Sequence, residues 1–105
     1  MPGLGDIMKQ AQKMRAEMER IQAEAAAKTV EGSAGGGMVS VVANGKGEIL
    51  SVKIDPEVVR GEDIEMLQDL VTAAANDALR KARELLTQEV ARLAGGMGLP
   101  PGLLL

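Results

Sequence analysis

The chain has 105 residues, a formal net charge of −3, and no cysteine, histidine, phenylalanine, tyrosine or tryptophan. Disulfides and thiolate metal sites are excluded, and the side chain best suited to proton transfer near neutral pH is missing, so we expect no metal, no cofactor, no small-molecule substrate and no enzymatic activity. Without aromatic residues the core must be built from small and aliphatic side chains, which predicts that the chain completes its core by forming a homodimer.

The first predicted element is a helix that runs from Asp6, as its N-cap, to about Lys28. Its apolar residues alternate at spacings of three and four, which is the seam of a coiled coil. The seam consists of Leu4, Ile7, Ala11, Met14, Met18, Ile21 and Ala25. The remaining face carries mixed charges, a pattern typical of a solvated helix surface.

Three strands are predicted next. The first covers Thr29 to Ser33, and the glycines at 35–37 supply a chain reversal because glycine readily adopts positive φ. Val39, Val41 and Ala43 share one face of the second strand, and Leu50, Val52 and Ile54 share one face of the third. The segment Asn44-Gly45-Lys46-Gly47 closes the hairpin between them. These strands predict a three-stranded antiparallel meander.

A single helical turn over 55–59 precedes the second long helix, which we expect from near Glu62 to Ala94, with Gly95-Gly96 as its stop. An alanine band in its middle permits close approach of another backbone. Most of its acids precede its bases Arg80, Lys81, Arg83 and Arg92, with Glu84 and Glu89 among the bases. That order suits the helix dipole as well as it suits contacts with nucleic acid, and both explanations stay open.

The predicted organisation is therefore α+β in the order α-β-β-β-α, with one domain over residues 1–94 and a flexible Gly/Pro-rich tail over 95–105. No stretch approaches the roughly 18 apolar residues that span a bilayer, and the first residues lack the pattern of a secretory signal. We expect a cytoplasmic protein that makes no membrane contact.

Five motifs in this order and spacing make the whole chain resemble the YbaB/EbfC nucleoid-associated family. They are Met8-Lys9-Gln10-Ala11-Gln12-Lys13-Met14, the hairpin from Gly35-Gly36-Gly37 to Asn44-Gly45-Lys46-Gly47, Ser51-Val52-Lys53-Ile54-Asp55-Pro56, Ala74-Ala75-Asn76-Asp77-Ala78, and Gly98-Leu99-Pro100-Pro101-Gly102. The resemblance implies a dimer whose helices project like tweezers. It also implies DNA binding in the nucleoid that alters DNA conformation and affects gene expression.

A net charge of −3 runs against DNA binding, which normally draws on a concentrated basic surface, so a basic footprint must be assembled locally. A two-fold dimer would duplicate the candidate DNA-binding residues, which are Lys9, Lys13, Arg15, Arg20, Arg80, Lys81 and Arg83. We expect salt-sensitive contacts with the phosphates of double-stranded DNA. The alternative is a dimeric protein-interaction scaffold that does not bind DNA, which the acidic net charge and the Met-bearing seam favour.

Overall fold

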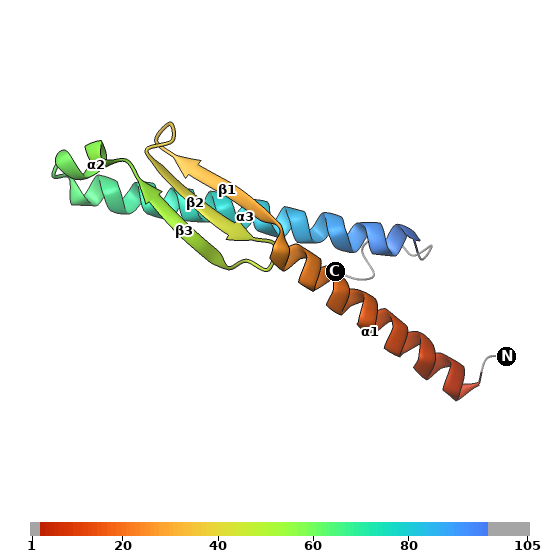
Figure 1. Ribbon diagram of the computed structural model, residues 1–105. Helices are drawn as coiled ribbons and strands as arrows, with labels where there is room; N and C mark the ends of the chain where they lie inside the picture. Colours follow the sequence, from red (N-terminus) through yellow and green to blue (C-terminus); the bar gives the residue numbers. More distant parts are fainter. Residues whose placement is uncertain (1–2, 97–105) are drawn as a thin grey trace.

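A computed structural model describes residues 3–96 of the chain. It contains α1 (Leu4–Ala27), β1 (Thr29–Ala34), β2 (Val39–Asn44), β3 (Ile49–Ile54), the short helix α2 (Pro56–Arg60) and α3 (Ile64–Gly96), as Figure 1 shows. The strands form one antiparallel sheet in the order β1-β2-β3. The predicted α+β meander between two long helices is confirmed.

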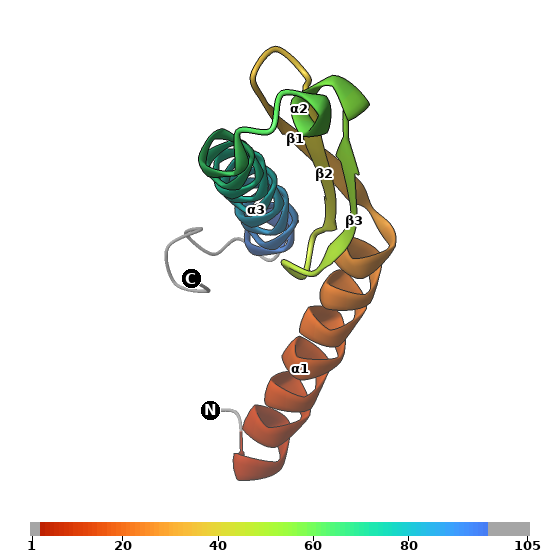
Figure 2. The same cartoon turned by 90° about the vertical axis from the view of Figure 1, so that its left-hand side faces the viewer.

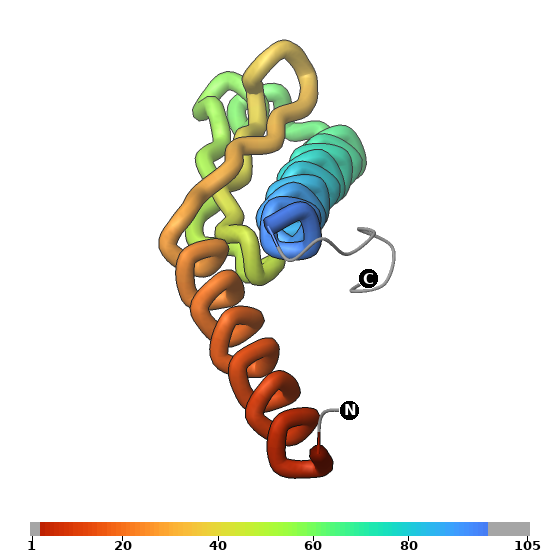
Figure 3. Tube along the Cα trace, turned by 90° about the vertical axis from the view of Figure 1, so that its right-hand side faces the viewer, coloured from red at the N-terminus to blue at the C-terminus, as the bar shows by residue number. Residues whose placement is uncertain are grey.

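The molecule is elongated, with extents of 70 × 20 × 18 Å. Helix α3 lies along one face of the sheet and contacts β1 and β2, whereas α1 leaves the sheet and diverges from the C-terminal half of α3 (Figures 1, 2 and 3). The predicted seam of α1 packs only at its C-terminal end, where Ile21 and Ala25 are buried, while Leu4 and Ile7 are exposed. We call residues 4–20 of α1 the arm.

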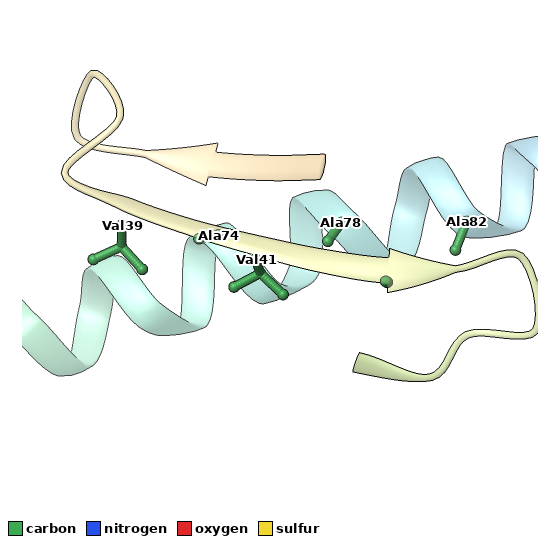
Figure 4. Close-up of a cluster of buried hydrophobic side chains, with 6 residues drawn as sticks. Val39, Val41, Ala74, Ala78 and Ala82 are labelled. Atoms are coloured by element: carbon green, nitrogen blue, oxygen red, sulfur yellow. The ribbon is translucent and has the colours of Figure 1, made fainter. Parts of the chain in front are cut away.

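The core is a layer of small side chains between the sheet and α3. Val39, Val41 and Ala43 of β2 are fully buried against Ala74, Ala78 and Ala82 of α3 (Figure 4). On the neighbouring strand, a Cβ added at Gly32 would lie 2.2 Å from the backbone nitrogen of Ala78 and 2.6 Å from the carbonyl oxygen of Ala74. The alanine band therefore admits the close approach of a backbone, as its composition predicted, and that backbone is β1.

The turn between β2 and β3 also anchors α1. The buried side-chain oxygen of Asn44 accepts hydrogen bonds from the backbone nitrogens of Lys46 (3.0 Å) and Glu48 (3.1 Å), and Gly47 has a φ of 85°. The backbone nitrogen of Gly45 donates to the carbonyl oxygen of Ala25 at 2.8 Å, and a Cβ at Gly45 would lie 2.6 Å from that oxygen. The last turn of α1 is thus bonded directly to the hairpin.

The helix ends differ from the predicted ones. Asp6 is not the N-cap of α1, because the helix begins earlier, after Gly3, whose carbonyl oxygen accepts from the backbone nitrogen of Asp6. Helix α3 begins at Ile64, where the carboxylate of Asp63 accepts from the backbone nitrogen of Met66 at 2.9 Å. It also continues through Gly95 and Gly96, since glycine inside a helix costs only about 1 kcal/mol relative to alanine. The rest of the predicted tail, 97–105, lies outside the described residues.

The pairing of β2 with β3 contains an irregularity. Val52 pairs with Val41 and Ile54 with Val39, but Ala43 pairs with Ile49 because the ladder shifts after Val42. Leu50 is therefore the extra residue of a β-bulge. A bulge inserts one residue without changing the alternating apolar pattern on either side, so that pattern could not reveal it.

The close contact at Gly32 predicts that Gly32→Ala lowers the free energy of unfolding by about 3 kcal/mol or more, because overpacking against backbone atoms cannot be relieved by a side-chain rotation. Urea denaturation followed by circular dichroism measures this loss. The matched control is Gly5→Ala in α1, where a Cβ meets nothing within 4 Å. Equal stability of the two variants would contradict the close packing.

Candidate nucleic-acid interface

The predicted basic residues of α1 do not share one surface. At 3.6 residues per turn, Lys9, Lys13 and Arg20 form a stripe, whereas Arg15 lies about 120° or more away around the helix. The guanidinium of Arg20 is held by Glu17 at 2.6 Å and by Glu24 at 2.8 Å. The hydrogen bonds that Arg20 donates, mainly to Glu17 and secondly to Glu24, raise the pKa of Arg20 above its usual value.

The arm carries three of the cations that are available to a ligand. Within residues 3–96, Lys9, Lys13 and Arg15 form no ion pair, and all three side chains are exposed. Figure 1 shows that α1 projects from the sheet. Lys9 and Lys13 are exposed and lie one helical turn apart on this helix, where an extended polyanion can contact both. The stripe of Lys9 and Lys13 is the strongest candidate for phosphate contacts.

The three predicted basic residues of α3 have different surroundings. Arg80 pairs with Asp77 (2.7 Å) and Glu84 (2.8 Å), while Lys81 pairs with Asp77 (3.3 Å) and donates to the carbonyl oxygen of Glu31 at 2.9 Å. Arg83 is exposed and has no ion pair in the described part of the chain. Arg80 and Arg83 line a shallow hollow that does not include the arm. The structure therefore does not join the α3 cations to the arm stripe within one protomer.

Asp77 organises this α3 cluster. Its carboxylate accepts a hydrogen bond from the backbone nitrogen of Ser33 at 3.1 Å and faces Arg80 and Lys81. The Ser33 N–H first, then the two cations, lower the pKa of Asp77 below its usual range. The carboxylate thus accepts from the Ser33 backbone of β1 and forms ion pairs with two of the seven predicted site residues.

A groove of about 690 Å³ separates α1 from the C-terminal end of α3. Its lining contains equal numbers of cations and carboxylates. The cations are Lys13, Arg20 and Arg92, and the carboxylates are Glu17, Glu24 and Glu89. The apolar lining residues are Met14, Ile21 and Leu93. The remaining lining residues are Gln10 and Gly96. We call this space the arm groove. Its balanced charge makes it a poor site for a polyanion on its own.

Sequence reasoning missed Glu89 and its partners at the closed end of the arm groove. Glu89 is 5% exposed, and its carboxylate accepts from the ammonium of Lys28 and from Arg92, the latter at 2.8 Å. Lys28 first and Arg92 second lower the pKa of Glu89. The spacing of Glu89 and Arg92 on one helix is visible in the sequence. The contact with Lys28, 61 residues away, depends on the tertiary fold.

Two other kinds of site are not found in residues 3–96. No group of three or more His, Cys, Asp or Glu residues there could hold a metal ion. None of the helices in that part is both long enough and apolar enough to cross a bilayer.

The fold and the arm agree with comparisons to known proteins. The model of the YbaB/EbfC DNA-binding family matches residues 1–97, so the chain belongs to this family. A protein named "Nucleoid-associated protein" from Acetivibrio thermocellus is 55% identical over 106 residues, covering 97% of this chain and 94% of its own. A protein of the same name from Syntrophobacter fumaroxidans is 56% identical over 100 residues, covering 91% of each chain.

A solved structure shows the same fold. The crystal structure of the uncharacterized protein HP0035 from Helicobacter pylori matches with a TM-score of 0.76 and 27% sequence identity. The match covers 92% of this chain and 98% of that one. The arrangement of helices and sheet is thus shared by nearly the whole of both chains.

The lowered pKa of Asp77 predicts an acid-dependent stability. The unfolded carboxyl binds a proton more readily than the folded one, so its contribution is fully present above the unfolded pKa of about 3.9 and is lost as pH falls through the folded pKa. The stability difference between wild type and Asp77→Asn should be largest near neutral pH and shrink below about pH 4. Urea titrations at several pH values measure it.

The matched control for this prediction is Asp69→Asn. Asp69 lies on the same helix, is exposed and forms no ion pair among the described residues. Its replacement should change stability little at any pH. A difference for Asp77→Asn that stays constant with pH would contradict the assignment of the ion cluster.

Proposed function

We propose that this protein is a nucleoid-associated protein that binds double-stranded DNA as a homodimer, mainly through phosphate contacts. The carrying observation is the unpaired, projecting stripe of Lys9 and Lys13 in a chain that belongs to a DNA-binding family. Binding of this kind alters DNA conformation and so affects nucleoid organisation and gene expression. The protein acts in the cytoplasm at the nucleoid and has no catalytic role.

The chemistry of the arm favours phosphates over base edges. Lysine ammonium groups are compact point charges that neutralise phosphates and release condensed counterions, which gives affinity without sequence information. Arg80 and Lys81 of α3 contribute less attraction, because they are paired with Asp77 and Glu84. Affinity should therefore depend on the number of arms that reach one duplex, which a dimer doubles.

The surface that supports the homodimer is β3. This edge strand has no neighbour on one side, and it carries exposed apolar residues, namely Ile49 (47%), Leu50 (55%) and Val52 (47%). Val52 and Ile49 face the α3 side of the sheet, where α3 covers β1 and β2 but leaves β3 largely open. An unpaired apolar edge favours association, and a second copy across a two-fold axis would cover both surfaces with the same residues.

A pair of charge reversals tests the arm. Lys13→Glu should weaken binding to a labelled duplex uniformly across sequences and lower the slope of log affinity against log salt by about 1 for each phosphate that is no longer neutralised. Arg60→Glu is the matched control, because it changes the charge equally on exposed α2, at the other end of the molecule (Figure 1). Fluorescence anisotropy at several salt concentrations measures both. Equal losses for the two variants would assign the effect to net charge and not to the arm.

A second pair of variants tests the dimer surface. Val52→Glu places a charge in the proposed apolar interface and should convert the dimer to monomers in sedimentation experiments. Ser51→Glu is the control, since this exposed neighbour points to the opposite face of the sheet. Circular dichroism confirms that both variants stay folded. A Val52→Glu protein that sediments as a dimer would move the interface away from β3.

The alternative function is a dimeric protein-interaction scaffold, and the arm groove is the observation that favours it. The groove is balanced in charge and is lined by Met14, Ile21 and Leu93, which suits a partner of low charge better than a polyanion. The two functions differ in their response to salt, since phosphate contacts weaken steeply with ionic strength and an apolar interface does not. No duplex binding even at low salt would favour the scaffold.

A further inference from the structure

The buried carboxylate of Glu89 requires a physical explanation. Glutamate is almost never buried without a partner, and moving a carboxylate out of water has an unfavourable desolvation term that its ion pairs only partly offset. An apolar residue of similar volume at such a site is often equally stable. Stability alone therefore does not account for a charged residue here, and buried ion pairs are best explained where they select one geometry among several.

Glu89 lies at the base of α1, where this helix meets the rest of the described chain. Lys28, which donates to Glu89, is the residue at which α1 ends, whereas Arg92 belongs to α3 itself. The other anchors are also in the last turns of α1, where Ile21 and Ala25 are buried and the carbonyl oxygen of Ala25 accepts from Gly45. Beyond them the arm groove is open. The angle of the arm is thus determined at its base.

A small change at the base has a large effect at the basic stripe. A helix rises about 1.5 Å per residue, so Lys9 lies about 28 Å from Lys28, and a tilt of about 10° moves it by about 5 Å. Phosphate charges occur about every 1.7 Å along a duplex. A displacement of about 5 Å therefore decides which phosphates two arms can reach together.

We propose that Glu89 is a positioning residue that fixes the arm by joining the end of α1, through Lys28, to α3. The consequence for DNA rests on the proposed function, whereas the angle of the arm does not. Glu89 touches no DNA and holds the helix that carries Lys9 and Lys13. Lys28 is the connecting partner, and Arg92 balances the charge of Glu89 from within α3.

Distance measurements between spin labels test the position of the arm without DNA. The chain contains no cysteine, so Gln12→Cys on the exposed side of α1 and Thr87→Cys on the exposed side of α3 provide the only two labelling sites. Excess unlabelled protein restricts the signal to distances within one protomer. Wild type should give a narrow distribution, and both Glu89→Gln and Lys28→Met should broaden it.

Three control variants separate positioning from a general loss of stability. Lys28→Arg keeps the cation and should restore the narrow distribution, and Arg92→Met should leave it narrow because Arg92 does not connect the two helices. Glu84→Gln removes an exposed, paired carboxylate of α3 and should have no effect. If Glu89→Gln does not fold, Lys28→Met decides, since its side chain is half exposed and its loss leaves Glu89 paired with Arg92.

The outcomes are distinct from those of the DNA test. A distribution as narrow in Lys28→Met as in wild type, or equal broadening in Arg92→Met, overturns the positioning role whatever the protein binds. If the arm is positioned as proposed and binds DNA, Lys28→Met should bind several-fold more weakly and bend an end-labelled duplex less than Lys28→Arg. A broadened distance distribution with unchanged DNA affinity and bending would mean that Glu89 positions the arm but that the arm does not bind DNA.

Discussion

The contact of the α3 backbone with the β1 backbone is the constraint on which the rest of the molecule depends. It requires glycine at position 32 and alanines at 74 and 78, because a single added carbon at Gly32 would overlap main-chain atoms of the helix. The same alanines leave room for the valines of β2, so that two strands and one helix share a thin layer. The position of α3 on the sheet determines where the elements that extend from this layer, including the arm, lie.

A core this thin cannot cover every apolar residue of the chain. The largest fully buried side chains are valines, and α3 is too narrow to shield β3 as well as β1 and β2. The exposed edge of β3 and the bare seam of the arm follow from that geometry. They are the surfaces through which a chain without aromatic residues can gain further burial, and association is the physical means available to it.

Local patterns predicted most of the fold, and tertiary contacts account for what they missed. The Asn44-Gly45 hairpin, the alanine band and the two long helices depend on short-range signals, and the structure contains all of them. The bulge at Leu50 has no such signal. For the candidate site, the sequence reveals the cations but not their partners. Only the fold shows that Arg80 and Lys81 share Asp77 and that Lys13 has no carboxylate paired with it among the described residues.

The hydrogen bond between the Gly45 nitrogen and the Ala25 carbonyl oxygen also affects the chemical ageing of the protein. An asparagine followed by glycine is a weak point in a polypeptide, since the glycine nitrogen can attack the asparagine side chain and release ammonia. Here that nitrogen donates to the carbonyl oxygen of Ala25, while the Asn44 amide is buried and hydrogen-bonded to Glu48. The docked end of α1 therefore occupies the nitrogen that would attack. Detachment of the arm would make the hairpin susceptible to deamidation as well as freeing the helix.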